Sequence, residues 1–160
     1  MRIEQDFVEL LKLFNKYQIR YCVIGAFAFG FHARPRYTKD LDILLEPTKE
    51  NGGKIVDALN EFGFKSLKLT EKDFSQKEKF IQLGYEPVRV DLITSIKGIT
   101  FDKIWQNKVQ GTYGGEKVYF ISLDDLIKSK KIAKRKQDMA DLEILIDVKQ
   151  RATIRSKMAH

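Results

Sequence analysis

The sequence has a single cysteine, Cys22, which excludes an intramolecular disulfide and any metal cluster built from cysteines. Because Cys22 lies in the apolar run 21–24, we expect a buried and unreactive thiol. Long apolar runs are also lacking, since no segment approaches the ~20 apolar residues that span a bilayer. The start of the chain, 1–6, is too polar for a signal peptide or a membrane anchor. These absences predict a soluble, cytoplasmic protein with no membrane partner.

Repeats, low-complexity tracts and linkers are absent as well, and the length of 160 residues fits one domain. We therefore predict a single domain over 1–150 and a polar tail, 151–160, that frays. Hydrophobic residues make up 43% of the chain, enough for one core. Lys and Arg number 29 against 22 Asp and Glu, which gives a net charge of +7. This charge suits a polyanionic partner, either nucleic acid or a triphosphate, although a solvated lysine-rich surface has the same composition.

The apolar pattern predicts helices and strands that follow one another along the chain. Helical spacing and capping residues predict helices over 6–17, 26–32, 48–62, 101–107, from 122 onward and 137–151. Short apolar or alternating runs predict strands over 21–24, 40–45, 64–69, 80–83, 88–94 and 118–121, with a turn at 84–87. A segment with three glycines, 111–116, precedes the last strand. The mixture predicts an α/β (α+β) fold, in which helices pack mainly on one side of a mixed sheet and C-terminal helices follow.

Two acidic residues, Asp40 and Asp42, flank Leu41 at the start of the predicted strand 40–45. Residues two apart in a strand project to the same face, so the carboxylates lie together and Leu41 faces the core. Two like charges this close raise each other's pKa unless a cation lies between them. The pattern indicates a hard divalent metal site or a carboxyl kept protonated for acid–base chemistry. Two exposed acids at a strand end remain the alternative.

A third acid, Asp91, lies in the apolar strand 88–94, where an unpaired carboxylate is costly to bury. If that strand lies beside 40–45, Asp91 completes a set of three carboxylates that suits Mg²⁺ or Mn²⁺. Two such ions can lower the pKa of an attacking hydroxyl and stabilise a leaving pyrophosphate. The predicted catalytic and metal-binding residues are therefore Asp40, Asp42 and Asp91.

Gly25 and Ala26 follow the first predicted strand directly and precede a predicted helix. Small residues at such a turn let the backbone approach a phosphate, and amides at a helix N-terminus favour an anion. Because strand-to-helix turns of this kind are common, the pair indicates a phosphate site only in combination with the carboxylates.

Four features occur in a fixed order along the chain: Ile24-Gly25-Ala26, the spacer 27–39, Asp40-Leu41-Asp42 and the later Asp91. They resemble the signature of the nucleotidyltransferase superfamily that has the DNA polymerase beta fold. In that signature a hydrophobic residue is followed by Gly, by Gly or Ser, by a spacer and by two acids around a hydrophobic residue. Ala26 stands where the family has Gly or Ser, and it offers a phosphate only its backbone amide.

A narrower resemblance rests on further motifs: His32, Arg36-Tyr37-Thr38, Leu126-Ile127-Lys128-Ser129-Lys130 and the segment 135–142. They are similar to motifs of small prokaryotic nucleotidyltransferases, including the abortive-infection toxin (AbiEii-like) type. By this resemblance Asp40 and Asp42 bind metal and triphosphate, and Asp91 binds the catalytic metal. The implied nucleotide-binding residues are Gly25, Ala26, Arg36, Thr38, Lys130, Arg135 and Asp138.

The resemblance also implies a role for each of these side chains. Arg36 contacts phosphate or anchors its loop, and Thr38 supports that loop by hydrogen bonding. Lys130 neutralises phosphate charge, and Asp138 orients Lys130 or a neighbouring arginine. The basic run 128–136 is otherwise a solvated helix face, and His32 is either a packed helix residue or a ligand. We expect no role for His160.

The implied activity is the Mg²⁺-dependent (or Mn²⁺-dependent) transfer of a nucleoside monophosphate from a nucleoside triphosphate to an acceptor hydroxyl. The acceptor is RNA, in particular a tRNA end, a protein side chain or a small molecule. Two alternatives remain open. The chain is a nucleotide- or RNA-binding module without efficient turnover, or it is the toxin half of a pair whose antitoxin covers the acidic site. A separate helical partner protein is a further expectation.

Overall fold

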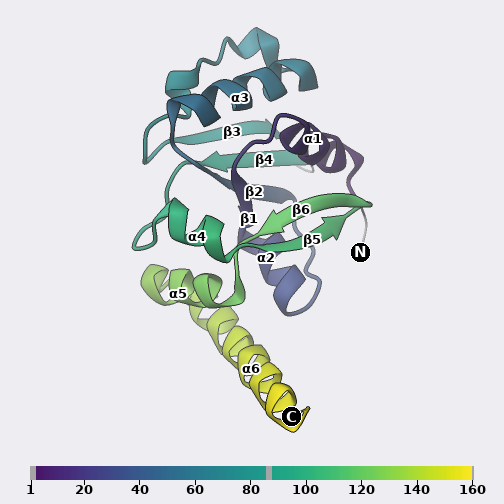
Figure 1. The fold of residues 1–160 in the computed structure, drawn as a ribbon, viewed down its shortest axis with the longest axis vertical. Coiled ribbons are helices and arrows are strands. Elements are labelled where there is room, and N and C mark those ends of the chain that lie inside the picture. The colour runs from purple at the N-terminus through teal and green to yellow at the C-terminus, as the bar shows by residue number, and fades with distance from the viewer. Residues whose placement is uncertain (1–2, 86–87, 160) are drawn as a thin grey trace.

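The computed structural model describes residues 3–85 and 88–159, and its centre is a mixed β-sheet (Figure 1). In this part of the chain six strands form one sheet in the order β3-β4-β2-β1-β6-β5. Their bounds are β1 Tyr21–Ile24, β2 Asp40–Leu45, β3 Phe80–Tyr85, β4 Val88–Ile93, β5 Val109–Tyr113 and β6 Glu116–Phe120. The β2–β4 and β1–β6 pairs are parallel, and the other neighbours are antiparallel.

Six α-helices surround this sheet within the described residues: α1 Gln5–Lys16, α2 Gly25–His32, α3 Lys49–Leu59, α4 Phe101–Asn107, α5 Leu123–Ala133 and α6 Lys136–Met158. Helix α1 contacts β6 and α3, whereas α2 packs on β1 and β2. Helices α5 and α6 pack on each other, and α6 extends away from the sheet toward the C-terminal end (Figure 1). The predicted class, an α+β fold with a mixed sheet and C-terminal helices, is confirmed.

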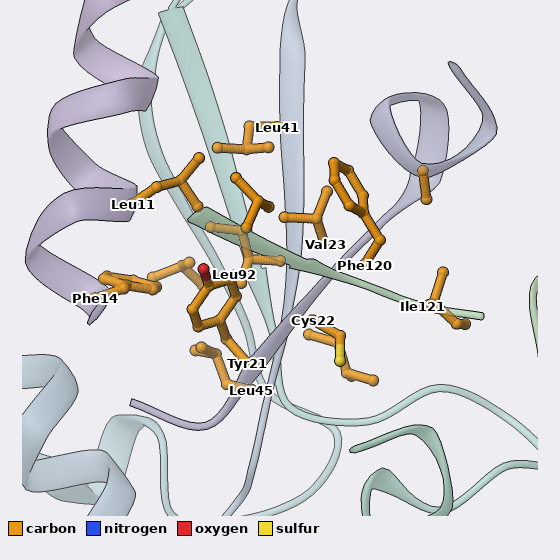
Figure 2. Packing of buried hydrophobic residues seen from close by; sticks show 14 of the residues in the cluster. Leu11, Phe14, Tyr21, Cys22, Val23, Leu41, Leu45, Leu92, Phe120 and Ile121 are labelled. Carbon is orange, nitrogen blue, oxygen red and sulfur yellow. The ribbon is translucent and has the colours of Figure 1, made fainter. Parts of the chain in front are cut away.

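The alternation of apolar and acidic residues along β2 places a core face and an acidic face on the same strand. Leu41, Ile43 and Leu45 are at most 1% exposed, because their face of the sheet is covered. Figure 2 shows Leu41 and Leu45 in one cluster with Leu11 and Phe14 of α1. Burying each of these side chains stabilises the fold by about 1.5–3 kcal/mol. The apolar residues of β2 therefore hold the strand in place, and the acidic residues between them are left on the other face.

Three predicted elements differ from the structure. The segment 64–69 forms no strand but two short helical segments, Asn60–Phe64 and Lys65–Leu67, because Gly63 and Lys68 have positive φ angles of 122° and 52°. The glycine-rich segment forms β5 and a hairpin to β6. Gly114 and Gly115 make its turn with φ of 58° and 83°, the conformation that tight hairpins require.

The third difference concerns the end of the chain. Helix α6 does not fray after residue 151 but continues to Met158, although residues 151–159 are all exposed. No Gly or Pro interrupts this stretch, so nothing in the sequence ends the helix earlier. Part of the predicted turn, Glu86 and Pro87, and the terminal His160 lie outside the described residues.

Candidate active site

The parallel pairing of β2 and β4 brings the predicted acids together. Asp42 is directly opposite Asp91 in the register, and Asp40 is opposite Arg89. Neighbouring strands are ~4.8 Å apart, and opposed residues project to the same face. The three carboxylates therefore lie on one face of adjacent strands, opposite the face that carries Leu41, as the sequence predicted.

Arg89 is a member of this cluster that sequence reasoning missed. Its Nε donates to Asp91 Oδ1 and its terminal amino group to Asp91 Oδ2, both at 3.0 Å. The same Nε lies 3.8 Å from Asp40 Oδ1. The available signal was spacing, because a residue two before Asp91 in a strand projects to the same face. Arg89 thus places a positive charge against Asp91 and near Asp40.

Charge repulsion among the acids remains strong despite Arg89. Burial, followed by the nearby Asp91 and Asp40, raises the pKa of Asp42 to about 7, and Arg89 only partly opposes this. Oδ1 of Asp40 is buried and has no hydrogen-bond partner among the described residues. An unpaired buried carboxylate oxygen is costly, so this site favours an added cation.

With the side chains in this arrangement, no group of three or more His, Cys, Asp or Glu side chains within 3–85 and 88–159 is set to hold a metal ion. Arg89 donates one hydrogen bond to each carboxylate oxygen of Asp91. Arg89 therefore competes with a cation for Asp91.

Gly25 follows β1 and begins α2 beside Asp42. Its φ is +69°, a conformation that glycine adopts without strain. A Cβ atom added at this position would collide with Oδ2 of Asp42. Glycine is therefore required here for two reasons, and the backbone of this turn lies against the carboxylate. Ala26 lies in the first turn of α2, next in sequence.

A cavity of about 320 Å³ opens next to Asp42. Four of the predicted nucleotide-binding residues line it: Gly25, Lys130, Arg135 and Asp138. Its remaining walls are mostly apolar and include Ile93, Ile121 and Leu126. Two carboxylates, a glycine turn, three cationic side chains and an apolar wall thus share one cavity, a composition that suits a nucleotide.

The cations of the cavity are held by buried acids on α6. Lys130 donates to Asp138 at 3.1 Å and to Asp141 at 3.0 Å. Arg135 Nε donates to Asp138 Oδ2 at 2.7 Å, although the Arg135 side chain is 76% exposed. Hydrogen bonds from Arg135 and then from Lys130 keep the pKa of Asp138 below its ordinary value. Asp138 is therefore an ionised anchor for both cations, consistent with its predicted orienting role.

Arg36 and Thr38 hold the loop that precedes β2. Arg36 donates to both oxygens of Asp141, at 2.6 and 3.2 Å, and its guanidinium lies 3.9 Å from the centre of the Phe29 ring. The hydroxyl of Thr38 accepts from the Asp40 amide at 3.2 Å. Of the two roles predicted for Arg36, the geometry supports the anchoring of this loop. Asp141, which accepts these hydrogen bonds, is 105 positions from Arg36 in the sequence and was not predicted to belong to the site.

His32 is a packed helix residue. Its Nε2 donates to the carbonyl oxygen of Ile121 at 2.7 Å, and burial lowers its pKa. Burial thus favours the neutral imidazole, and its Nε2 is already bonded, which favours the packing role over that of a ligand. Separately, none of the helices built from the described residues combines the length and apolar character needed to cross a bilayer.

Solved structures of similar architecture cover nearly the whole chain. A nucleotidyltransferase candidate from Thermotoga maritima has a TM-score of 0.58 at 15% identity and covers 99% of this chain and 96% of its own. The lincosamide antibiotic adenylyltransferase LnuA, bound to lincomycin, has a TM-score of 0.55 at 14% identity, with 91% and 97% covered. ANT(2″)-Ia in complex with adenylyl-2″-tobramycin has a TM-score of 0.56 at 12% identity, with 96% and 98% covered. At such identities these similarities establish the fold alone.

No curated protein sequence matches the chain. A family model does match, over residues 1–149, and its description is "Nucleotidyltransferase of unknown function (DUF6036)". The matched range contains the three carboxylates, the glycine turn and the anchored cations described above. Because the match covers most of the 160 residues, this chain belongs to that family of nucleotidyltransferases.

Proposed function

We propose that the protein transfers a nucleoside monophosphate from a nucleoside triphosphate to an acceptor hydroxyl, with Asp40, Asp42 and Asp91 as its catalytic acids. The observation that carries the proposal is the register of Asp42 opposite Asp91, with a cationic cavity beside Asp42. In the reaction the acceptor oxygen bonds to the α-phosphorus, and the bond from that phosphorus to the bridging oxygen breaks. Pyrophosphate leaves, and the hydroxyl proton passes to water.

The donor set fits a divalent cation. Carboxylate oxygens are the ligands that Mg²⁺ and Mn²⁺ prefer, and Asp40 Oδ1 is buried without a hydrogen-bond partner among the described residues, 3.8 Å from Arg89 Nε. Burial first, and then the charges of Asp91 and Asp40, raise the pKa of Asp42, and a cation at this site would oppose the effect of those charges. Mg²⁺ or Mn²⁺ bound by these three acids would neutralise the charge that develops on the transferred phosphate.

The residues around the cavity have distinct roles in this proposal. Backbone amides of Gly25 and Ala26 bind the triphosphate at the start of α2. Lys130 and Arg135 compensate the charge of the leaving pyrophosphate, and Asp138 keeps both cations in position. The apolar wall holds the nucleobase and excludes water from it.

Incubation of the purified protein with each labelled nucleoside triphosphate and Mg²⁺ tests the proposal. Separate reactions contain total RNA, a protein mixture or an aminoglycoside, because the solved relatives include an adenylyl-tobramycin complex. Asp42→Asn is expected to abolish transfer. Asp124→Asn, a change at a side chain that is 70% exposed and pairs with Lys149, is the matched control and is expected to retain it. Equal label from both variants would refute the assignment of Asp42.

A second candidate, a nucleotide-binding module without turnover, is favoured by one observation. Arg89 binds both oxygens of Asp91 and competes with any cation for them. This candidate predicts that the wild-type protein binds nucleoside triphosphate and transfers none of it to any acceptor, whereas Arg89→Ala, which frees Asp91, gains transfer.

A further inference from the structure

Given the proposed function, on which this inference rests, the position of the cavity determines the side from which an acceptor approaches. In an in-line displacement the attacking and leaving oxygens lie on opposite sides of the phosphorus. The cations that would receive pyrophosphate, Lys130 and Arg135, line the cavity together with Gly25, which follows β1. The leaving group thus lies toward these three residues, while the apolar wall of the same cavity extends to Ile93 of β4. The acceptor then approaches from the direction opposite to Lys130 and Arg135, past Asp91 and β3.

Two side chains of β3 project toward that approach. Gln82 is opposite Asp91 in the register, and Phe80 is opposite Ile93, two residues further along the same face. Phe80 is 57% exposed, although a phenylalanine on a structured strand is usually buried. Because β3 is an edge strand of the sheet, no further strand covers this side. An exposed ring and an amide therefore flank the third carboxylate on the acceptor side.

The chemistry around Phe80 matches that of a single-stranded nucleic acid. Aromatic side chains bind bases by stacking, and this mode of binding tolerates any sequence because every base has a π face. Lys77 precedes the strand and is exposed, and the whole chain has a net charge of +7. These charges complement the phosphates of a strand whose end reaches Asp91.

We propose that Phe80 and Gln82 form an acceptor platform for the end of an RNA strand. The terminal base stacks on Phe80, and Gln82 hydrogen-bonds the terminal ribose, so that its hydroxyl lies next to Asp91. Phe80 then acts on the binding of the acceptor, whereas Gly25, Lys130 and Arg135 act on the binding of the triphosphate.

The test compares two exposed aromatic residues of the same strand. Phe80 is even-numbered and Tyr85 is odd-numbered, so they project from opposite faces, and Tyr85 is 86% exposed. Binding of a fluorescein-labelled single-stranded RNA of about ten nucleotides is measured by anisotropy, and a fluorescent ATP analogue (mant-ATP) with Mg²⁺ reports the nucleotide site. We expect Phe80→Ala to weaken RNA binding about 5- to 100-fold, while Tyr85→Ala changes it less than 2-fold and Phe80→Trp restores it. None of the three variants is expected to alter mant-ATP affinity.

Other results of these measurements would contradict either the acceptor platform or the proposed function. Equal weakening by Phe80→Ala and Tyr85→Ala, or no weakening by Phe80→Ala, overturns the platform. So does a change of molar mass in light scattering that accompanies the loss of RNA binding, because the exposed strand would then pair with a second copy. Failure of the wild-type protein to bind mant-ATP or any other nucleoside triphosphate overturns the proposed function itself, whatever the RNA measurement gives.

Discussion

Replacing Asp141 by alanine is expected to lower the free energy of unfolding by about 3 kcal/mol, because it breaks a buried ion cluster. The Asp141 side chain is 2% exposed and accepts hydrogen bonds from Arg36, Lys130 and Gln137. Removing one member of a fully buried pair costs about 3–5 kcal/mol. Lys130 keeps Asp138 as a partner and Arg36 is 29% exposed, so the lower end of that range applies.

Urea denaturation followed by circular dichroism measures this loss. With a slope of about 2 kcal/mol per molar urea, the midpoint is expected to fall by about 1.5 M. The matched control is Asp147→Ala on the same helix, since Asp147 is 56% exposed and pairs with Arg151 at 3.0 Å. An exposed pair of this kind contributes less than about 0.5 kcal/mol. If the two variants unfold within 0.5 M urea of each other, the buried cluster does not stabilise the loop before β2 as described.

Three further predictions concern the acids and their partners. Arg89→Ala frees both oxygens of Asp91, so calorimetric titration should show Mn²⁺ binding to the nucleotide-free protein tighten at least 3-fold; unchanged affinity would refute competition. Asp42→Asn removes like-charge repulsion, so its urea midpoint in EDTA at pH 8 should rise above that of the wild type; a fall would contradict the repulsion. The hydrogen bond from Arg135 lowers the pKa of Asp138, so the ionised carboxylate stabilises the fold above the ordinary aspartate pKa, and this stability is lost as pH falls below about 4. Urea midpoints measured from pH 7 to pH 3 should show the loss. In Asp138→Asn the midpoint should fall less over the same pH range.

The sequence predicted the individual strands of the site better than it predicted which strands pair with one another in the sheet. Alternation around Leu41 identified β2 and the shared face of its acids, because strand periodicity is a local property. That β4 pairs with β2, however, depends on the path of the whole chain between them. The resemblance to the polymerase beta fold supplied that expectation, and the register confirms that Asp42 and Asp91 are opposed.

Failures of prediction have equally specific causes. Lys68 takes a left-handed conformation that apolar patterning does not reveal, so 64–69 was wrongly predicted as a strand. Gly114 and Gly115 carry a recognised hairpin signal, which the prediction did not use, and β5 was missed. The pairing of Arg36 with Asp141 joins residues 105 positions apart, and no single-sequence pattern identifies such a contact.

The contact between Gly25 and Asp42 has a consequence for how relatives of this protein can diverge. A side chain at position 25 would need a left-handed backbone and would displace the Asp42 carboxylate from its place. The two positions are therefore coupled, and a residue larger than glycine at 25 is expected to cost least where residue 42 has also become smaller. Relatives of this protein should show the two changes together more often than either change alone.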